Sequence, residues 1–277
     1  LDHYGDPAAI EEAFAAFVGR VVPGGHLVAC ADDAGARRVA ERAAAAGLAV
    51  VTYGTSPDAV VRLGSWVPEG DGGAVEVRDT RDGAAVTLRL PVPGAHNGLD
   101  AAAALAVAGL LGVGPAEAAA ALAGFRGTGR RFEDRGTRHG VRVVDDYAHH
   151  PTEVAALLAA ARAVAGAGRV LVLFQPHLYS RTRAFAAEFA AALAAADLAV
   201  VTDVYAARED PDPAVTGALI ADRLPPGVGR FVPDRREAAA LVGRAARAGD
   251  LVLTVGAGDV TELAPLVLDA VPAPEET

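Results

Sequence analysis

The stretch HLVACADDAGARRVAERAAAAGLAVVTYG, residues 26–54, decides what kind of fold this chain has. It opens with a short apolar run, continues with a segment of helical spacing and closes with a second apolar run. Asp32 or Asp33 stands where the helix would be capped, and Gly47 stands where it would end. Because strand, helix and strand in this order form the unit of a parallel sheet, the stretch predicts an α/β fold.

The residues that follow indicate antiparallel strands in the same first domain. Residues 74–90 alternate between apolar and other side chains around the turn RDG, which predicts a hairpin. Residues 91–98 predict a loop. Residues 99–112 and 115–125 are typical of two helices, the second with a proline at its first position, where it costs no hydrogen bond.

The second half of the chain repeats the alternation of strands and helices. A loop rich in glycine and arginine at 126–136 separates it from the first, so we expect two domains, 1–125 and 126–277. The alternation predicts a Rossmann-like second domain with a mostly parallel sheet. Strands are expected at 141–147, 169–174, 198–205, around 230 and at 250–256, with helices from 151, up to 196, near 214 and from 234.

Composition excludes several classes of protein. The net charge of −10 argues against a general nucleic-acid-binding protein. The sequence contains no uncharged apolar run of about eighteen residues and no basic leader before an apolar stretch, so neither a membrane span nor a secretory signal is expected. The single cysteine, Cys30, cannot form an intrachain disulfide, and a reducing cytoplasm is the simplest location. All 25 basic residues are arginine, which excludes a lysine-containing phosphate loop and a Schiff-base lysine.

The first polar cluster at the end of a predicted strand is VVDDYAHHPTE, residues 143–153. Ligands of open parallel sheets bind beyond the carboxyl ends of the strands, and the helix expected from Pro151 would offer free N–H groups to an anion. A functional site and a solvated, capped loop are equally good interpretations of the cluster. Its candidate side chains are Asp145, Asp146, Tyr147, His149 and His150.

The second cluster, VLFQPHLYSRTR at residues 172–183, again follows an apolar strand. Ser180 could cap the helix that comes next. Arg181 and Arg183 would lie in its first turn, where a cation opposes the helix dipole, and an anionic ligand would explain that placement. The alternative is that both arginines simply extend into solvent.

Two further segments carry weaker signals. GTGRRFED, residues 127–134, places Arg130 and Arg131 in an expected hinge, where an arginine suits a phosphate sensor, although a solvated basic linker is the commoner explanation. GAHNGLD, residues 94–100, precedes a predicted helix, and its polar residues could form only a turn and a cap.

Together these segments resemble the Mur ligases of peptidoglycan synthesis. The motifs HNGLD, GTGRRFE, DDYAHHPTE, FQPHLYSRT, DVYAARE and GAGD occur in that order over most of 94–259. The resemblance implies that 1–125 is the later part of the central ATP-binding domain and that 126–277 is the C-terminal domain. DDYAHHP and FQPHLYSRT are most similar to the branch that uses ATP and Mg²⁺ to join L-alanine to the lactoyl carboxylate of UDP-N-acetylmuramate through an acyl phosphate.

The resemblance also implies which residues contact ATP. Asn97 matches an asparagine that contacts adenine, with His96 beside it. Asp100 stands where the family usually has a second asparagine, and an aspartate cannot donate to a ring nitrogen. Arg131 matches a catalytic hinge arginine that reaches the ATP phosphates, and Asp146 matches the acid that holds the ribose.

The substrate contacts follow from the same resemblance. His149 matches a catalytic group near the γ-phosphate and the acceptor, and Tyr147 lies in the same loop. His177 and Arg181 match groups on the UDP-sugar. Leu178 stands where the family often has an arginine, so one contact to a substrate anion is expected to be missing.

The resemblance finally implies that a part of the family's enzyme precedes this sequence. The family's lysine-containing phosphate loop has no counterpart, and its metal-binding histidine would come just before Leu1. His3 is then expected to be a surface residue at the start of a helix, and no metal ligand is expected. We expect the isolated chain to be inactive and to need the missing N-terminal part of the same enzyme as its partner. The alternatives are a murein peptide ligase with a tripeptide acceptor and a non-catalytic nucleotide-binding module.

Overall fold

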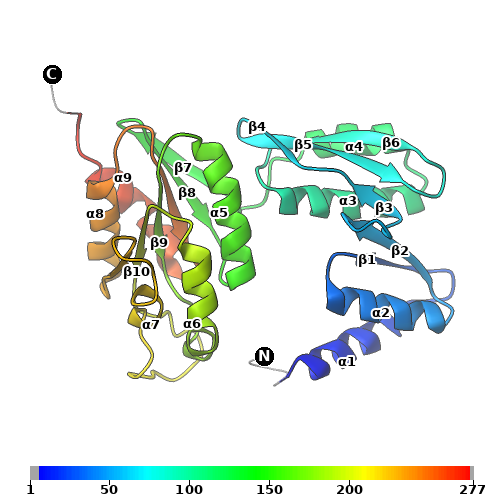
Figure 1. Ribbon diagram of the computed structural model, residues 1–277, viewed down its shortest axis with the longest axis horizontal. Helices are drawn as coiled ribbons and strands as arrows, with labels where there is room; N and C mark the ends of the chain where they lie inside the picture. The colour runs from blue at the N-terminus through cyan, green and yellow to red at the C-terminus, as the bar shows by residue number, and fades with distance from the viewer. Residues whose placement is uncertain (1–5, 275–277) are drawn as a thin grey trace. The chain divides into compact units, whose positions relative to one another are not determined.

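The computed structural model describes residues 6–274, which form two compact units (Figure 1). Unit 1 ends at Arg126 and unit 2 begins at Gly127. His3 lies outside the described residues. Within those residues, no helix is long and apolar enough to cross a membrane.

Unit 1 is built on a mixed sheet with the strand order β1-β2-β3-β5-β4, to which β6 adds by pairing with β5. The first three strands are parallel, and the pairs that involve β5 are antiparallel, so the predicted β-α-β unit and the hairpin are both confirmed. Asp33 caps the second helix, since its side chain accepts from the N–H of Ala36 at 2.7 Å. The elements are α1 (Pro7–Val18), β1 (His26–Cys30), α2 (Ala34–Ala45), β2 (Ala49–Gly54), β3 (Val61–Leu63), β4 (Val67–Glu69), β5 (Gly72–Asp79), β6 (Ala85–Leu90), α3 (Ala95–Leu110) and α4 (Pro115–Ala123).

Unit 2 contains the predicted parallel sheet, with the strand order β11-β10-β9-β12-β8-β7. All neighbouring pairs are parallel except β7 with β8. The order places β12 between β8 and β9, which are consecutive in the chain. The elements are β7 (Glu133–Arg138), β8 (Val141–Asp146), α5 (Pro151–Ala165), β9 (Val170–Phe174), α6 (Tyr179–Leu193), β10 (Leu198–Val201), α7 (Ala218–Ala221), β11 (Gly229–Phe231), α8 (Arg235–Ala245), β12 (Leu251–Val255), the 3₁₀ helix η1 (Asp259–Leu263) and α9 (Ala264–Ala270).

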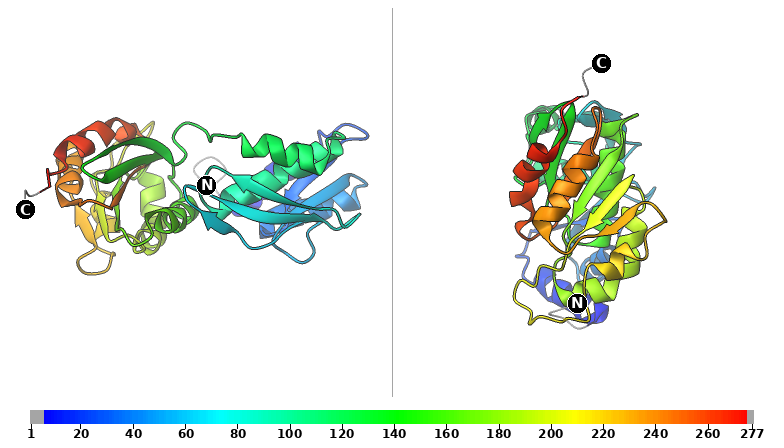
Figure 2. Two further views of the ribbon diagram at one scale, coloured as in Figure 1. Left: turned by 90° about the horizontal axis from the view of Figure 1, so that it is seen from above. Right: turned by 90° about the vertical axis from the view of Figure 1, so that its left-hand side faces the viewer.

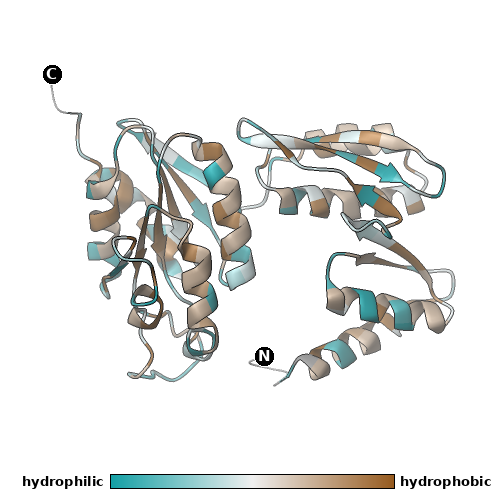
Figure 3. Cartoon of the chain, viewed as in Figure 1, coloured by the Kyte–Doolittle hydropathy of each residue, from teal (hydrophilic) through white to brown (hydrophobic). Residues whose placement is uncertain are grey.

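Helices cover both faces of the unit 2 sheet, as the right-hand view of Figure 2 shows. Every residue of β9 is buried, and successive side chains enter opposite layers. Val172 and Phe174 pack with α5 and α6, whereas Leu171 and Leu173 pack with α8 and α9. The central strands are accordingly among the most apolar parts of the chain (Figure 3). A strand buried on both faces has no polar side chain until it ends, so chemistry gathers at the strand ends.

Three expectations about local structure were wrong. Part of the predicted loop at 126–136 belongs to the polar strand β7, which the pattern could not reveal because it forms by pairing with the edge of β8. The expected loop at 91–98 ends early, since α3 begins at Ala95 after Gly94, whose φ of 103° an L side chain rarely adopts. The helix expected near 214 is the short α7, which begins only at Ala218.

Ser180 does not cap its helix, which is a fourth correction. The N-cap position of α6 is Leu178, with a φ of 72° and no side-chain hydrogen bond, and Ser180 lies inside the first turn. Arg181 lies in that turn as predicted.

We expect Phe189→Ala to lower the free energy of unfolding by about 3–5 kcal/mol, because truncation of a buried aromatic ring leaves a cavity. Phe189 is 1% exposed, and its ring centroid lies 5.2 Å from that of Phe174. Denaturant titration followed by far-ultraviolet circular dichroism measures the change. Phe17→Ala is the control, since that side chain is 70% exposed and its loss should cost less than about 0.5 kcal/mol. Equal effects of both substitutions would contradict the assigned packing.

Candidate functional site

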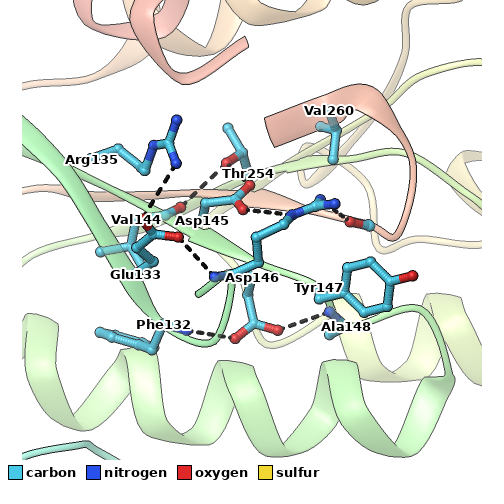
Figure 4. Close-up of polar contacts among 12 residues, drawn as sticks. Phe132, Glu133, Arg135, Val144, Asp145, Asp146, Tyr147, Ala148, Thr254 and Val260 are labelled. Atoms are coloured by element: carbon cyan, nitrogen blue, oxygen red, sulfur yellow. Dashed lines mark hydrogen bonds and ion pairs between the residues drawn. The ribbon is translucent and has the colours of Figure 1, made fainter. Parts of the chain in front are cut away.

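The carboxyl end of β8 holds a fully buried carboxylate, Asp145, shown in Figure 4. One of its oxygens accepts from Thr254 Oγ1 on β12 at 2.7 Å, and the other lies 3.1 Å from Nε of Arg130. A buried charge is tolerated when it is paired and hydrogen-bonded in this way. Asp145 therefore has a structural role, because its carboxylate connects β8 to β12 and to Arg130.

Arg130 supplies the cation of this pair. Its φ is 58°, and its Nη2 donates to the carbonyl of Gly256 at 2.6 Å. Its backbone N–H donates to Glu133 Oε2 at 2.7 Å, and its guanidinium lies 4.9 Å from the ring centroid of Tyr147. Arg130 thus connects the segment before β7 to the loops that follow β8 and β12.

Asp146, the neighbouring carboxylate, is also nearly buried and accepts two backbone hydrogen bonds (Figure 4). Phe132 N–H donates to one oxygen at 2.9 Å, and Ala148 N–H donates to the other at 2.8 Å. The carboxylate fixes the loop that carries Tyr147 and His149 against the segment before β7.

Arg131 differs from Arg130 in exposure. Its side chain is 47% exposed, and its ion pair with Glu153 spans 3.9 Å. Its guanidinium lies 5.5 Å from the ring centroid of Tyr147. Of the two adjacent arginines, Arg131 keeps the more accessible guanidinium.

Glu153 organises the start of α5. Its Oε2 accepts from the N–H groups of His149 and His150, at 2.9 and 3.1 Å, and His150 completes a capping box. The ring of His149 lies with Nδ1 2.9 Å from the carbonyl of Tyr147 and 3.3 Å from Glu153. Both neighbours are acceptors, so we assign the proton to Nδ1, which leaves Nε2 of a neutral His149 as an acceptor.

His177 follows β9 and stacks on Tyr205, with ring centroids 5.6 Å apart and an angle of 16° between the planes. Burial lowers the pKa of His177, and the charge of Arg181 lowers it further. Burial also lowers the pKa of His150, although Glu153 opposes that shift. The neutral forms of His150 and His177 are therefore favoured.

The sequence candidates of unit 2 converge at one edge of the sheet. The rings of Tyr147 and His149 are 5.2 Å apart, and those of His149 and His177 are 6.1 Å apart. Arg181 Nη1 donates a long hydrogen bond, 3.4 Å, to the carbonyl of His149. Aromatic and imidazole groups from the loops after β8 and β9 and a guanidinium from the first turn of α6 therefore form one cluster.

The remaining candidates belong to unit 1 and share the first turns of α3. Asn97 is half-buried, and its Nδ2 donates to the carbonyl of Pro93 at 2.7 Å and lies 3.2 Å from His96 Nε2. His96 and Asp100 are exposed. None of these side chains caps the helix.

Within residues 6–274, no three histidine, cysteine, aspartate or glutamate side chains converge in a way that could hold a metal ion.

Sequence reasoning missed Glu153, Tyr205 and Thr254. The spacing His150-Pro-Thr-Glu153 is a capping-box signal that could have indicated the first. Tyr205 and Thr254 carry no local signal, because their roles arise from contacts with residues far away in the chain.

The fold and the site define the class of protein to which this chain is similar. The model of the Mur ligase middle domain matches residues 1–108, and that of the Mur ligase glutamate ligase domain matches residues 130–258. The chain belongs to the Mur ligase family.

The relatives that it resembles are UDP-N-acetylmuramate–L-alanine ligases. That of Kineococcus radiotolerans is 59% identical, over 97% of this chain and 57% of the relative. That of Paenarthrobacter aurescens is 55% identical, over 98% and 58%. This chain thus spans somewhat more than half the length of these curated relatives.

Solved structures match the chain over a similar range. The UDP-N-acetylmuramate–alanine ligase of Thermotoga maritima matches with a TM-score of 0.75 at 27% identity, over 96% of this chain and 55% of that one. The MurF ligase of Thermotoga maritima in complex with ADP matches with a TM-score of 0.73 at 19% identity, over 97% and 58%, a likeness of fold alone.

We expect stability to fall as the pH drops below the ordinary histidine pKa of 6.5, because His177 has a lowered pKa when folded. In that window the unfolded chain binds more protons than the folded chain, so acid favours unfolding. His177→Asn should flatten, without abolishing, the fall in unfolding free energy, since the pKa of His150 is lowered too. Denaturant titrations from about pH 5 to 7.5 measure the slope.

Tyr205→Phe is the control for this measurement, because it keeps the ring that stacks on His177 and should keep the slope. An unchanged slope in His177→Asn would contradict the assigned environment of the ring.

Proposed function

We propose that this chain supplies part of the central domain and the whole C-terminal domain of an ATP-dependent ligase that joins L-alanine to UDP-N-acetylmuramate. The observation that carries the proposal is the cluster of Tyr147, His149, His177 and Arg181 at the carboxyl ends of β8 and β9. The 59% identity to a ligase of that name supports it. The cytoplasm, where ATP is plentiful, is the proposed location.

Arg131 is the group that we assign to the ATP phosphates. ATP would supply the phosphoryl group that activates the lactoyl carboxylate. A planar, permanently charged guanidinium suits phosphate oxygens, and that of Arg131 is accessible, whereas Arg130 is held by Asp145 and Gly256. The fit of an ATP phosphate to this site therefore rests on Arg131.

Asp146 and Asn97 are proposed to hold the nucleoside. The two oxygens of the Asp146 carboxylate accept from the N–H groups of Phe132 and Ala148, and a carboxylate is an acceptor of the kind that suits ribose hydroxyls. Asn97 offers an amide for the adenine, with His96 beside it, and Asp100 can only accept. Mg²⁺ remains a proposed cofactor of the whole enzyme, and no step is assigned to it.

The acceptor side of the reaction is assigned to the imidazoles and Arg181. Nε2 of neutral His149 can accept a proton from the attacking amine of L-alanine, and Tyr147 lies against the same ring. Arg181 can bind an anionic group of the UDP-sugar. His177, whose pKa is lowered, would contribute a neutral hydrogen-bonding group instead of a second charge.

A non-catalytic nucleotide-binding module is the second candidate. One observation favours it, namely that a chain without lysine cannot contain the family's phosphate-loop lysine. The two candidates differ in whether this chain completes an active enzyme.

The test joins this chain to the part of the Kineococcus radiotolerans relative that it does not match, and we call that protein the assembled ligase. We expect it to release phosphate from ATP only when UDP-N-acetylmuramate and L-alanine are both present. The isolated chain should show no such turnover, because it lacks a phosphate-loop lysine. An inactive assembled ligase that still binds nucleotide would support the binding module, and turnover by the isolated chain would contradict the division of labour.

In the assembled ligase, Arg131→Ala should lower kcat roughly 10²–10³-fold, the usual loss when a group that stabilises transition-state charge is removed. Steady-state phosphate release measures the change. Arg138→Ala is the matched control, since Arg138 pairs with exposed Asp269 at 2.6 Å and should leave kcat unchanged. Wild-type turnover in Arg131→Ala would make the residue a simple linker arginine.

A further inference from the structure

The start of α6 is capped by a residue from elsewhere in the chain. The N–H of Ser180 donates to Glu209 Oε2 at 3.0 Å, and the hydroxyl of Ser180 hydrogen-bonds to Oε1. The two residues are 29 positions apart. Glu209 thus replaces the side-chain cap that Leu178, in the N-cap position, does not provide.

The segment that carries Glu209, residues 203–212, is tied to the start of α6 by other contacts as well. Leu178 N–H donates to the carbonyl of Tyr205 at 3.0 Å, and Tyr205 N–H donates to that of Pro176 at 2.8 Å. His177 lies between Pro176 and Leu178 in the chain, and its ring stacks on that of Tyr205. The backbone of Tyr205 therefore bonds to the residue immediately before His177 and to the residue immediately after it.

The carboxylate of Glu209 also accounts for the position of Arg181 in the first turn of α6. Arginine in the first turn of a helix opposes the helix dipole and calls for a nearby anion. The protein supplies that anion itself, at the N–H of Ser180, one residue before Arg181. The guanidinium of Arg181 is directed instead to the loop after β8, where it contacts the carbonyl of His149.

We propose that Glu209 is a positioning residue that, through Ser180, fixes the first turn of α6 and so presents Arg181 to the anionic sugar nucleotide. This rests on the proposed function. Removal of the carboxylate leaves the N–H and hydroxyl of Ser180 to water, and the turn that carries Arg181 then loses the restraint that orients it. Glu209 itself need not touch the substrate.

The kinetic test uses the assembled ligase. Glu209→Ala should raise KM for UDP-N-acetylmuramate roughly five- to tenfold for the loss of the cap, with kcat changed less than about twofold. Ser180→Ala should raise KM less, because it removes the hydroxyl contact and keeps the N–H bond to Glu209. Glu209→Gln, which keeps one acceptor oxygen, should lie between Glu209→Ala and the unmodified enzyme. Asp212→Ala is the matched control, because it breaks the ion pair of Arg183 with the same segment and the hydrogen bond from Ala214 N–H, but leaves the contact of Glu209 with Ser180, and it should leave KM unchanged.

A double substitution separates positioning from simple stabilisation. Arg181→Ala should itself raise KM, and Glu209→Ala should add nothing further in that background, because Glu209 acts through Arg181. Wild-type KM in Glu209→Ala, with a lowered melting temperature alone, would overturn the inference. Additive increases in KM would overturn it too.

A second readout does not depend on turnover. In this chain itself, Glu209→Ala should increase hydrogen exchange at the amide of Ser180, whereas Asp212→Ala should not. Unchanged exchange in Glu209→Ala overturns the inference. Absence of activity in the unmodified assembled ligase would instead count against the proposed function, so the two failures are distinguishable.

Discussion

The buried ion pair between Arg130 and Asp145 is the constraint on which the rest of the unit 2 site depends. A carboxylate without solvent exposure would be strongly destabilising if it were unpaired. Arg130 neutralises it and also donates to Gly256, while Thr254 donates to its other oxygen. Through these bonds the segment before β7 and the ends of β8 and β12 are held as one structure.

The same principle recurs at the two helices that begin at this edge of the sheet. Glu153 caps α5 from within its own first turn, and Glu209 caps α6 from a distant segment. Carboxylates of the protein thus satisfy both helix starts. Arg131 keeps the more accessible guanidinium, and the imidazoles of His149 and His177 lie near each other in the cluster that we propose as the ligand site.

Much of the fold could be predicted because it follows from local patterns. The apolar runs, the cap at Asp33 and the hairpin each depend on residues that lie only a few positions apart in the sequence. The polar strand β7 could not be predicted in that way, because its residues carry no apolar pattern and form a strand by pairing with β8. The site followed the same division. Polar strand ends were visible, but adjacent Arg130 and Arg131 could be told apart only by their contacts.

By itself, the sequence determined that this is an α/β chain without lysine, in which polar residues follow buried strands. Those features depend on residue type and on short spacings. The tertiary structure alone decided which strand ends meet, because β12 inserts between β8 and β9 and brings Thr254 to Asp145. It also decided that Glu209 caps a helix 29 residues away. Such partners are fixed by the strand order and by burial, which favours a charge only where an opposite charge or a donor is already in place.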